Sequence, residues 1–199
     1  MDKVNEFEYG IDISTKARAG SLYFSRLSNE QFRYTSSEEL LSTDKGKKAL
    51  RDMIEAFFDI QRKRLDVLES YAQGDNYSIL SGSRRLDKEK ADYRVRHKWG
   101  GYISSFATSY VIGNPVTIGI LEGANKEQLK TIEEIEWQND INALNSDLAF
   151  DASVYGRAFE YHFRDKDSID RVVLISPLEM FVIRDLTVEQ NIIAAVHLP

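Results

Sequence analysis

Two stretches, Tyr110-Val-Ile-Gly-Asn-Pro-Val-Thr117 and Asp151-Ala-Ser-Val-Tyr-Gly-Arg-Ala-Phe-Glu160, decide the fold expected for this chain. In each stretch an apolar stripe at helical spacing runs up to a glycine, and the residues after the glycine alternate with a period of two. A glycine in this position is typical of a helix terminus, and the alternation is typical of a strand. Both stretches therefore predict a helix that leads into a sheet, which indicates a mixed α+β fold.

A long amphipathic helix is expected before these stretches, from near Asp44 to Gly74. Ser36 or Ser37 can cap a short segment ahead of it, but Gly46 weakens continuity between the two. At 1.5 Å per residue the long helix spans roughly 40 Å, and its opposite face is charged. The stripe expected to be buried consists of Leu50, Met53, Ile54, Phe57, Ile60, Leu65, Leu68 and Tyr71.

A second helix is expected from about Val95 to Ile112 and carries an aromatic stripe. At helical spacing, such a stripe is typical of a buried core face or a subunit contact rather than of a platform for stacking bases. We therefore expect the stripe to form the buried side of the helix. Its members are Trp99, Tyr102, Ile103, Phe106 and Tyr110.

Further elements follow from the same periodicities. A strand is expected at Val116–Leu121, a third helix after its cap at Asn125, and a fourth helix from Ile141 to Tyr155. Four strands are expected after Gly156, at residues 157–164, 171–175, 180–183 and 190–198, the first two joined as a hairpin. The predicted architecture is several helices packed with a small, mostly antiparallel sheet.

Four residues are interpreted as structural helix stops. Gly113 is expected to adopt the left-handed conformation that ends many helices, and Pro115 prevents the helix from resuming. The complete set is Gly74, Gly113, Pro115 and Gly156.

The chain is divided into two parts by this reading. Residues 1–35 mix short β-like pieces with glycines and serines, and we interpret them as an N-terminal arm ordered by packing on something else, such as a neighbouring subunit, or else as a floppy terminus. Residues 36–199 form a single α+β domain. Because the sequence stops at Leu198-Pro199 within a predicted strand, we expect a fragment of a longer protein.

Composition excludes several classes of function. Cysteine is absent, which excludes disulfides, thiolate zinc sites and a cysteine nucleophile, and no cofactor is expected. Apolar runs are far shorter than the roughly 20 residues needed to cross a bilayer. The net charge of −6 does not favour tight binding of nucleic acid by the chain as a whole.

A basic cluster, Arg94-Val-Arg-His-Lys98, lies at the start of the second helix. Because the helix dipole disfavours positive charge at this end, the cluster predicts an anionic partner. That partner is either a nearby acidic side chain or a nucleic-acid phosphate. Arg94, Arg96 and Lys98 are therefore candidates for an anion or subunit contact.

Catalytic motifs are not found in the sequence. Gly46-Lys47-Lys48 lacks both the first glycine and the final serine or threonine of a phosphate-binding loop. Glu133 and Glu136 share a helix face and could hold a metal, but lysines one turn away favour a solvated surface. We therefore expect a protein that is not an enzyme.

The order of these motifs resembles the N-terminal part of tailed-phage portal proteins, in particular those of phages that infect Gram-positive bacteria. The resemblance covers roughly residues 45–199 and includes the long helix, the basic segment, Val111-Ile-Gly-Asn-Pro-Val-Thr117, Ala152-Ser-Val-Tyr-Gly-Arg-Ala-Phe-Glu160 and Ile175-Ser-Pro-Leu-Glu179. After the long helix the family usually has two tyrosines, a glycine and then a histidine, whereas this chain has Tyr71-Ala-Gln-Gly74. Regions corresponding to the stem, clip and crown would lie beyond Pro199.

The resemblance implies a structural role in the virion. Portal proteins form a dodecameric ring at one capsid vertex, through which a terminase packages double-stranded DNA and through which the DNA is later ejected. The expected partners are further copies of the chain, terminase, capsid or scaffolding protein, a head-tail adaptor and DNA that passes without specific contacts. Assembly would take place in the host cytoplasm, and the residues present correspond to the outer wing.

Two other functions are compatible with the sequence. A metal-dependent phage enzyme acting on phosphodiesters would require Glu133 and Glu136 to converge with another acid in a cleft. A truncated prophage remnant or an adaptor would bind a ring without forming one.

Overall fold

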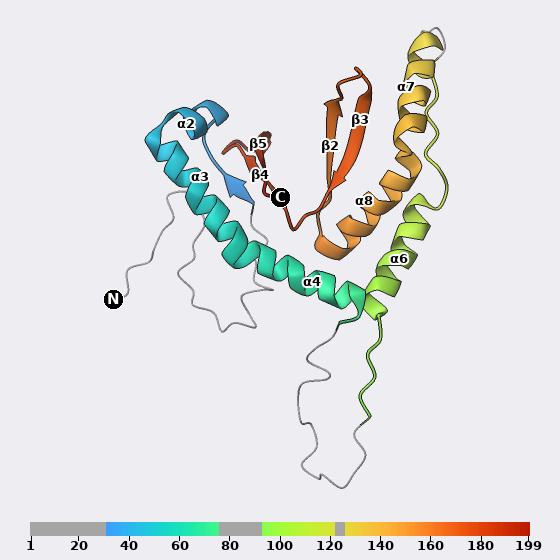
Figure 1. The fold of residues 1–199 in the computed structure, drawn as a ribbon, viewed down its shortest axis with the longest axis horizontal. Coiled ribbons are helices and arrows are strands. Elements are labelled where there is room, and N and C mark those ends of the chain that lie inside the picture. Colours follow the sequence, from blue (N-terminus) through green and yellow to red (C-terminus); the bar gives the residue numbers. More distant parts are fainter. Residues whose placement is uncertain (1–30, 76–92, 122–125) are drawn as a thin grey trace. The chain divides into compact units, whose positions relative to one another are not determined.

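The computed structural model describes residues 31–75, 93–121 and 126–199 of the chain. These residues belong to two compact units, one made of residues up to Val67 together with Leu178–Pro199, the other of Leu68–Pro177. Figure 1 shows the helices and strands of both units in sequence colours. Both units combine helices with a small sheet in which antiparallel pairing predominates, so the predicted α+β class is confirmed. Residues 1–30 of the predicted arm lie outside the described residues.

The first unit contains a three-stranded sheet with the order β1-β4-β5. Its central strand, β4 (Met180–Arg184), pairs antiparallel with β5 (Ile192–His197) and parallel with β1 (Phe32–Arg33). β1 comes from the end of the segment that we interpreted as an arm, and Phe32 is buried. The last residues of that segment are thus part of the sheet.

The helices of the first unit begin as the sequence predicts. α2 (Ser37–Ser42) is capped by the hydroxyl of Ser36, which accepts a hydrogen bond from Glu39 N–H. α3 (Asp44–Ala56) starts at the expected residue, and the hydroxyl of Thr43 accepts from Gly46 N–H at 2.9 Å. A Cβ at Gly46 would collide with the backbone of Glu39 and Leu40. Gly46 therefore allows α3 to pass close to the end of α2.

The long helix continues to Gln73 but changes its winding on the way, which the sequence analysis missed. Phe57–Arg62 forms a π-helix, η2, before α4 (Lys63–Gln73) resumes ordinary α-helical winding. Just beyond η2, Leu65 is buried as expected. Tyr71, which we expected to be buried, is exposed, and Ala72 is buried instead.

The core of the first unit is aromatic. The ring of Phe181 on β4 lies 4.9 Å from that of Phe32 and 5.1 Å from that of Phe57, measured between centroids. Contacts of this kind add about 0.5–1.5 kcal/mol each to the stabilisation from burial. The other large, fully buried side chains of this unit are Leu40, Met53, Leu65 and Ile183.

The second unit contains three further helices and a hairpin. The helices are α6 (Trp99–Ile112), α7 (Lys126–Asn139) and α8 (Ile141–Tyr155), and the hairpin pairs β2 (Phe159–Arg164) with β3 (Asp170–Ile175) in antiparallel fashion. α8 contacts α6, and both α7 and α8 contact β3 (Figure 1). The predicted helix exit at Gly156 and the four predicted strands after it are confirmed.

The strand expected at Val116–Leu121 is wrong. These residues are not part of a strand, and Val116, Ile118, Ile120 and Leu121 are all exposed. An apolar alternation becomes a strand only when a neighbouring strand takes up its backbone hydrogen bonds. No strand among the described residues pairs with this segment.

The four helix stops differ in conformation. Gly74 and Gly156 follow α4 and α8 and have positive φ angles of 82° and 74°. Gly113 follows α6 with a φ of −65°, so the left-handed conformation expected there is wrong. A Cβ at Gly113 would instead meet the carbonyl oxygen of Ser109. The backbone continues without a strand through Pro115.

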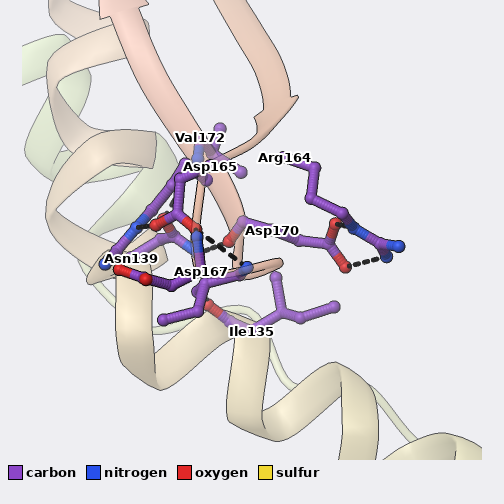
Figure 2. A network of polar contacts seen from close by, with 9 residues as sticks. Ile135, Asn139, Arg164, Asp165, Asp167, Asp170 and Val172 are labelled. Carbon is purple, nitrogen blue, oxygen red and sulfur yellow. Dashed lines mark hydrogen bonds and ion pairs between the residues drawn. The ribbon is translucent and has the colours of Figure 1, made fainter.

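One amide side chain joins α7 to the hairpin (Figure 2). Asn139 Nδ2 donates to the carbonyl oxygens of Ile135 and Asp170, both at 2.9 Å, and Asn139 Oδ1 accepts from Val172 N–H at 3.0 Å. Asn139 thereby satisfies backbone groups on the edge of β3 that β2 does not reach. The hairpin is closed by the ion pair between Arg164 and Asp170 at 2.9 Å.

Replacing Asn139 by alanine is expected to destabilise the chain by about 1–3 kcal/mol, because backbone groups of β3 would lose their hydrogen-bond partners. Urea unfolding followed by circular dichroism measures this loss. Asn142→Ala is the matched control, since Asn142 is exposed on α8. Equal losses in the two variants would contradict the role assigned to Asn139.

Candidate subunit-contact surface

The inner face of α6 is built from small residues. A Cβ at Gly100 would lie 2.9 Å from the carbonyl oxygen of Tyr71, and a Cβ at Gly101 would collide with the carbonyl oxygen of Ala72. Further along the same face, the buried hydroxyl of Ser104 accepts a hydrogen bond from the Ser153 hydroxyl of α8 at 3.0 Å. The small side chains thus let α6 approach both the end of α4 and α8 closely.

The outer face of α6 carries the large apolar side chains. We expected this stripe to be the buried side of the helix, but it is exposed within the described residues. The physical reason is the close contact on the opposite side: glycine and serine fit against α4 and α8, whereas an aromatic ring at either position would not. The exposed aromatic face of α6 consists of Trp99, Tyr102, Ile103, Phe106 and Tyr110, which are 62–85% exposed.

The basic segment lies immediately before this face. Arg96 Nη1 forms an ion pair with Asp75 Oδ1 at 2.7 Å, which is the acidic partner that the sequence analysis considered. The stem of Lys98 packs against Gly74 and Gly101, where its Cβ and Cε would meet an added Cβ at 3.0 and 2.7 Å. Arg94 is half-buried. The segment therefore fastens the start of α6 to the end of α4.

Acidic side chains gather where α4 and α8 approach each other. Burial raises the pKa of Asp151, and the charges of Asp147 and Glu69 raise it further. Among the described residues, no group of three histidines or carboxylates is placed to hold a metal ion. Glu133 and Glu136, the acids of the alternative enzymatic hypothesis, are half-buried or exposed on α7.

Asp151→Asn is expected to raise the melting temperature at pH 7. A carboxyl whose folded pKa is raised loses stabilisation as the pH climbs from about 4, its ordinary pKa, through the folded value, so at pH 7 its charge is a net cost. The amide removes that cost, and the gain should vanish near pH 3, where both states are protonated. Thermal melts at both pH values test this, with Glu133→Gln as the exposed control; an equal gain at both would contradict it.

Most of the long helix, the small inner face of α6 and the hairpin fall within a region that matches a known family. Residues 51–199 match the family described as phage portal protein, SPP1 Gp6-like. The chain belongs to this portal protein family. Comparison with curated proteins gave no match.

Membership in the portal family bears on the exposed face of α6, because proteins of this family assemble with further copies. Portal proteins are structural components of the phage, and membership implies an oligomeric ring associated with capsid and DNA. None of the described helices is long and apolar enough to span a membrane.

The outward aromatic face of α6 is the feature that the sequence analysis placed on the wrong side. The run of small residues at 100, 101 and 104 was the signal that could have identified the inner face.

Proposed function

We propose that this chain forms the wing region of a portal ring at one capsid vertex, through which double-stranded DNA is packaged and ejected. In this role it provides a docking site for terminase and for the head-tail connector. The match over residues 51–199 carries the proposal. The exposed aromatic face of α6 supports it, because a wing region must contact neighbouring subunits.

We propose further that the chain acts as a passive conduit subunit and not as an enzyme. Each phosphate that a protein neutralises adds salt-dependent affinity, which a moving duplex would have to break. A net charge of −6 on each copy keeps such contacts weak. In this proposal residues 36–199 form the wing-like domain. Residues 1–35 form an arm that packs on a neighbouring subunit, apart from its end, where β1 (Phe32–Arg33) pairs with β4 of the same chain.

Electron microscopy and native mass spectrometry of the purified chain test the proposed assembly. We expect closed rings of twelve copies, the number that the resemblance to portal proteins implies. Immunogold labelling of phage particles provides a second readout and should mark a single vertex. Labelling spread over the whole capsid, or absent from virions, would contradict the proposed function.

A further inference from the structure

We infer that the aromatic face of α6 binds a second copy of this chain, and that its counterpart on that copy is the apolar face of the β2–β3 hairpin. This inference rests on the proposed function, since it names the surfaces through which neighbouring copies would meet. Alternation and cross-strand pairing place Phe159, Tyr161, Phe163, Val173 and Ile175 on one side of the two strands. Arg171 lies opposite Phe163 on the same side, and its guanidinium is paired with Asp165 at 2.9 Å.

The size of the α6 face favours a protein partner. An aromatic side chain presents about 150–250 Å² of surface, so Trp99, Tyr102, Phe106 and Tyr110 together expose roughly 400–700 Å². The largest apolar patch on a typical monomer measures about 300–600 Å². With Ile103 added, the face approaches the roughly 800 Å² that each partner buries in a stable interface. One helix face therefore supplies most of an interface.

The hairpin offers a surface of matching chemistry. Tyr161 and Phe163 stack on each other with centroids 5.6 Å apart and an interplanar angle of 17°. Tyr161 is 52% exposed, and Val173, its partner across the strands, is 40% exposed. A two-stranded hairpin is marginal alone and gains stability when its apolar face is covered. Aromatic rings from α6 would cover it with favourable edge and stacking contacts.

The pairing of two different surfaces also suits a ring. A contact between two α6 faces would be self-complementary and would close at a dimer. A contact between α6 and a hairpin leaves one free α6 face and one free hairpin face on every pair. Further copies can then add in the same way until the ring closes.

Disulfide trapping tests the two surfaces directly, because the natural chain has no cysteine. Phe106→Cys and Tyr161→Cys chains are mixed and oxidised with diamide, and a covalent dimer is expected on a non-reducing gel only in the mixture. Val188→Cys is the control, since Val188 is almost fully exposed but belongs to neither face. A covalent dimer formed by the Phe106→Cys chain alone overturns the inference, as does the absence of a covalent dimer in the mixture.

A charge variant separates this inference from the proposed function. Phe106→Glu should weaken self-association at least tenfold in sedimentation equilibrium. It should leave the melting temperature of the dilute, unassociated chain unchanged, because the Phe106 side chain is exposed. Val188→Glu should change neither quantity. If Phe106→Glu still associates like the unmodified chain, the inference fails, while vertex labelling of virions would still support the portal role. Cross-linking between α6 and hairpin without vertex labelling would give the opposite result.

Discussion

Replacing Phe57 by alanine is expected to destabilise the first unit by about 3–5 kcal/mol, the usual cost of removing a buried aromatic ring. Phe57 is fully buried in η2, and its ring packs against Phe181 of β4 at 5.1 Å. The loss is a large share of the 5–15 kcal/mol that typically stabilises a domain. Urea unfolding followed by far-ultraviolet circular dichroism measures this loss of unfolding free energy.

The neighbouring phenylalanine provides the control for this prediction. Phe58 is 39% exposed, and its ring is covered on one side by the guanidinium of Arg62 at 5.3 Å. Because less of its surface is removed from water, Phe58→Ala should cost well under half as much as Phe57→Ala. Equal losses would mean that the π-helix does not turn Phe57 toward the sheet in solution.

The elements that could be predicted from the sequence are those encoded by local signals. Ser36 and Thr43 cap helices through their own hydroxyls, and Gly74 and Gly156 end helices in a conformation that glycine adopts most easily. The hairpin was predicted correctly because alternation and turn residues lie close together in the chain. None of these features depends on a distant part of the protein.

The features that were missed depend on contacts between distant segments. Periodicity shows that α6 has an apolar stripe, but it cannot show whether the chain itself or another molecule covers that stripe. The small residues Gly101 and Ser104 fit against α4 and α8, and this contact determines which side of α6 faces inward. In the same way, the alternation at Val116–Leu121 indicates a strand, yet no described strand pairs with it.

The π-helix was missed for a different reason. Its residues, Phe57–Arg62, fit an ordinary helical pattern, and no residue type in them marks the wider turn. Near the end of α4, Ala72 and not Tyr71 is buried, because the backbone of Ala72 lies against Gly101 of α6.

Gly101→Val is expected to destabilise the second unit by about 3 kcal/mol, although valine is a better helix former than glycine. A Cβ at this position would collide with the carbonyl oxygen of Ala72 and meet Lys98 Cε at 2.7 Å. Backbone atoms cannot move aside as the end of a flexible side chain can, so α6 would have to shift away from α4. That shift would also strain the hydrogen bond between Ser104 and Ser153. Thermal unfolding and hydrogen exchange of α6 measure the loss.

Gly119→Val tests whether the loss comes from the close approach of the two helices. A Cβ at Gly119 meets no atom within 4 Å, so the same change of side chain should alter stability by no more than about 0.5 kcal/mol. Comparable destabilisation in both variants would show that Gly101 does not hold α6 against α4. In that case the aromatic face of α6 would no longer be fixed as the outward side of the helix, and its exposure would need another cause.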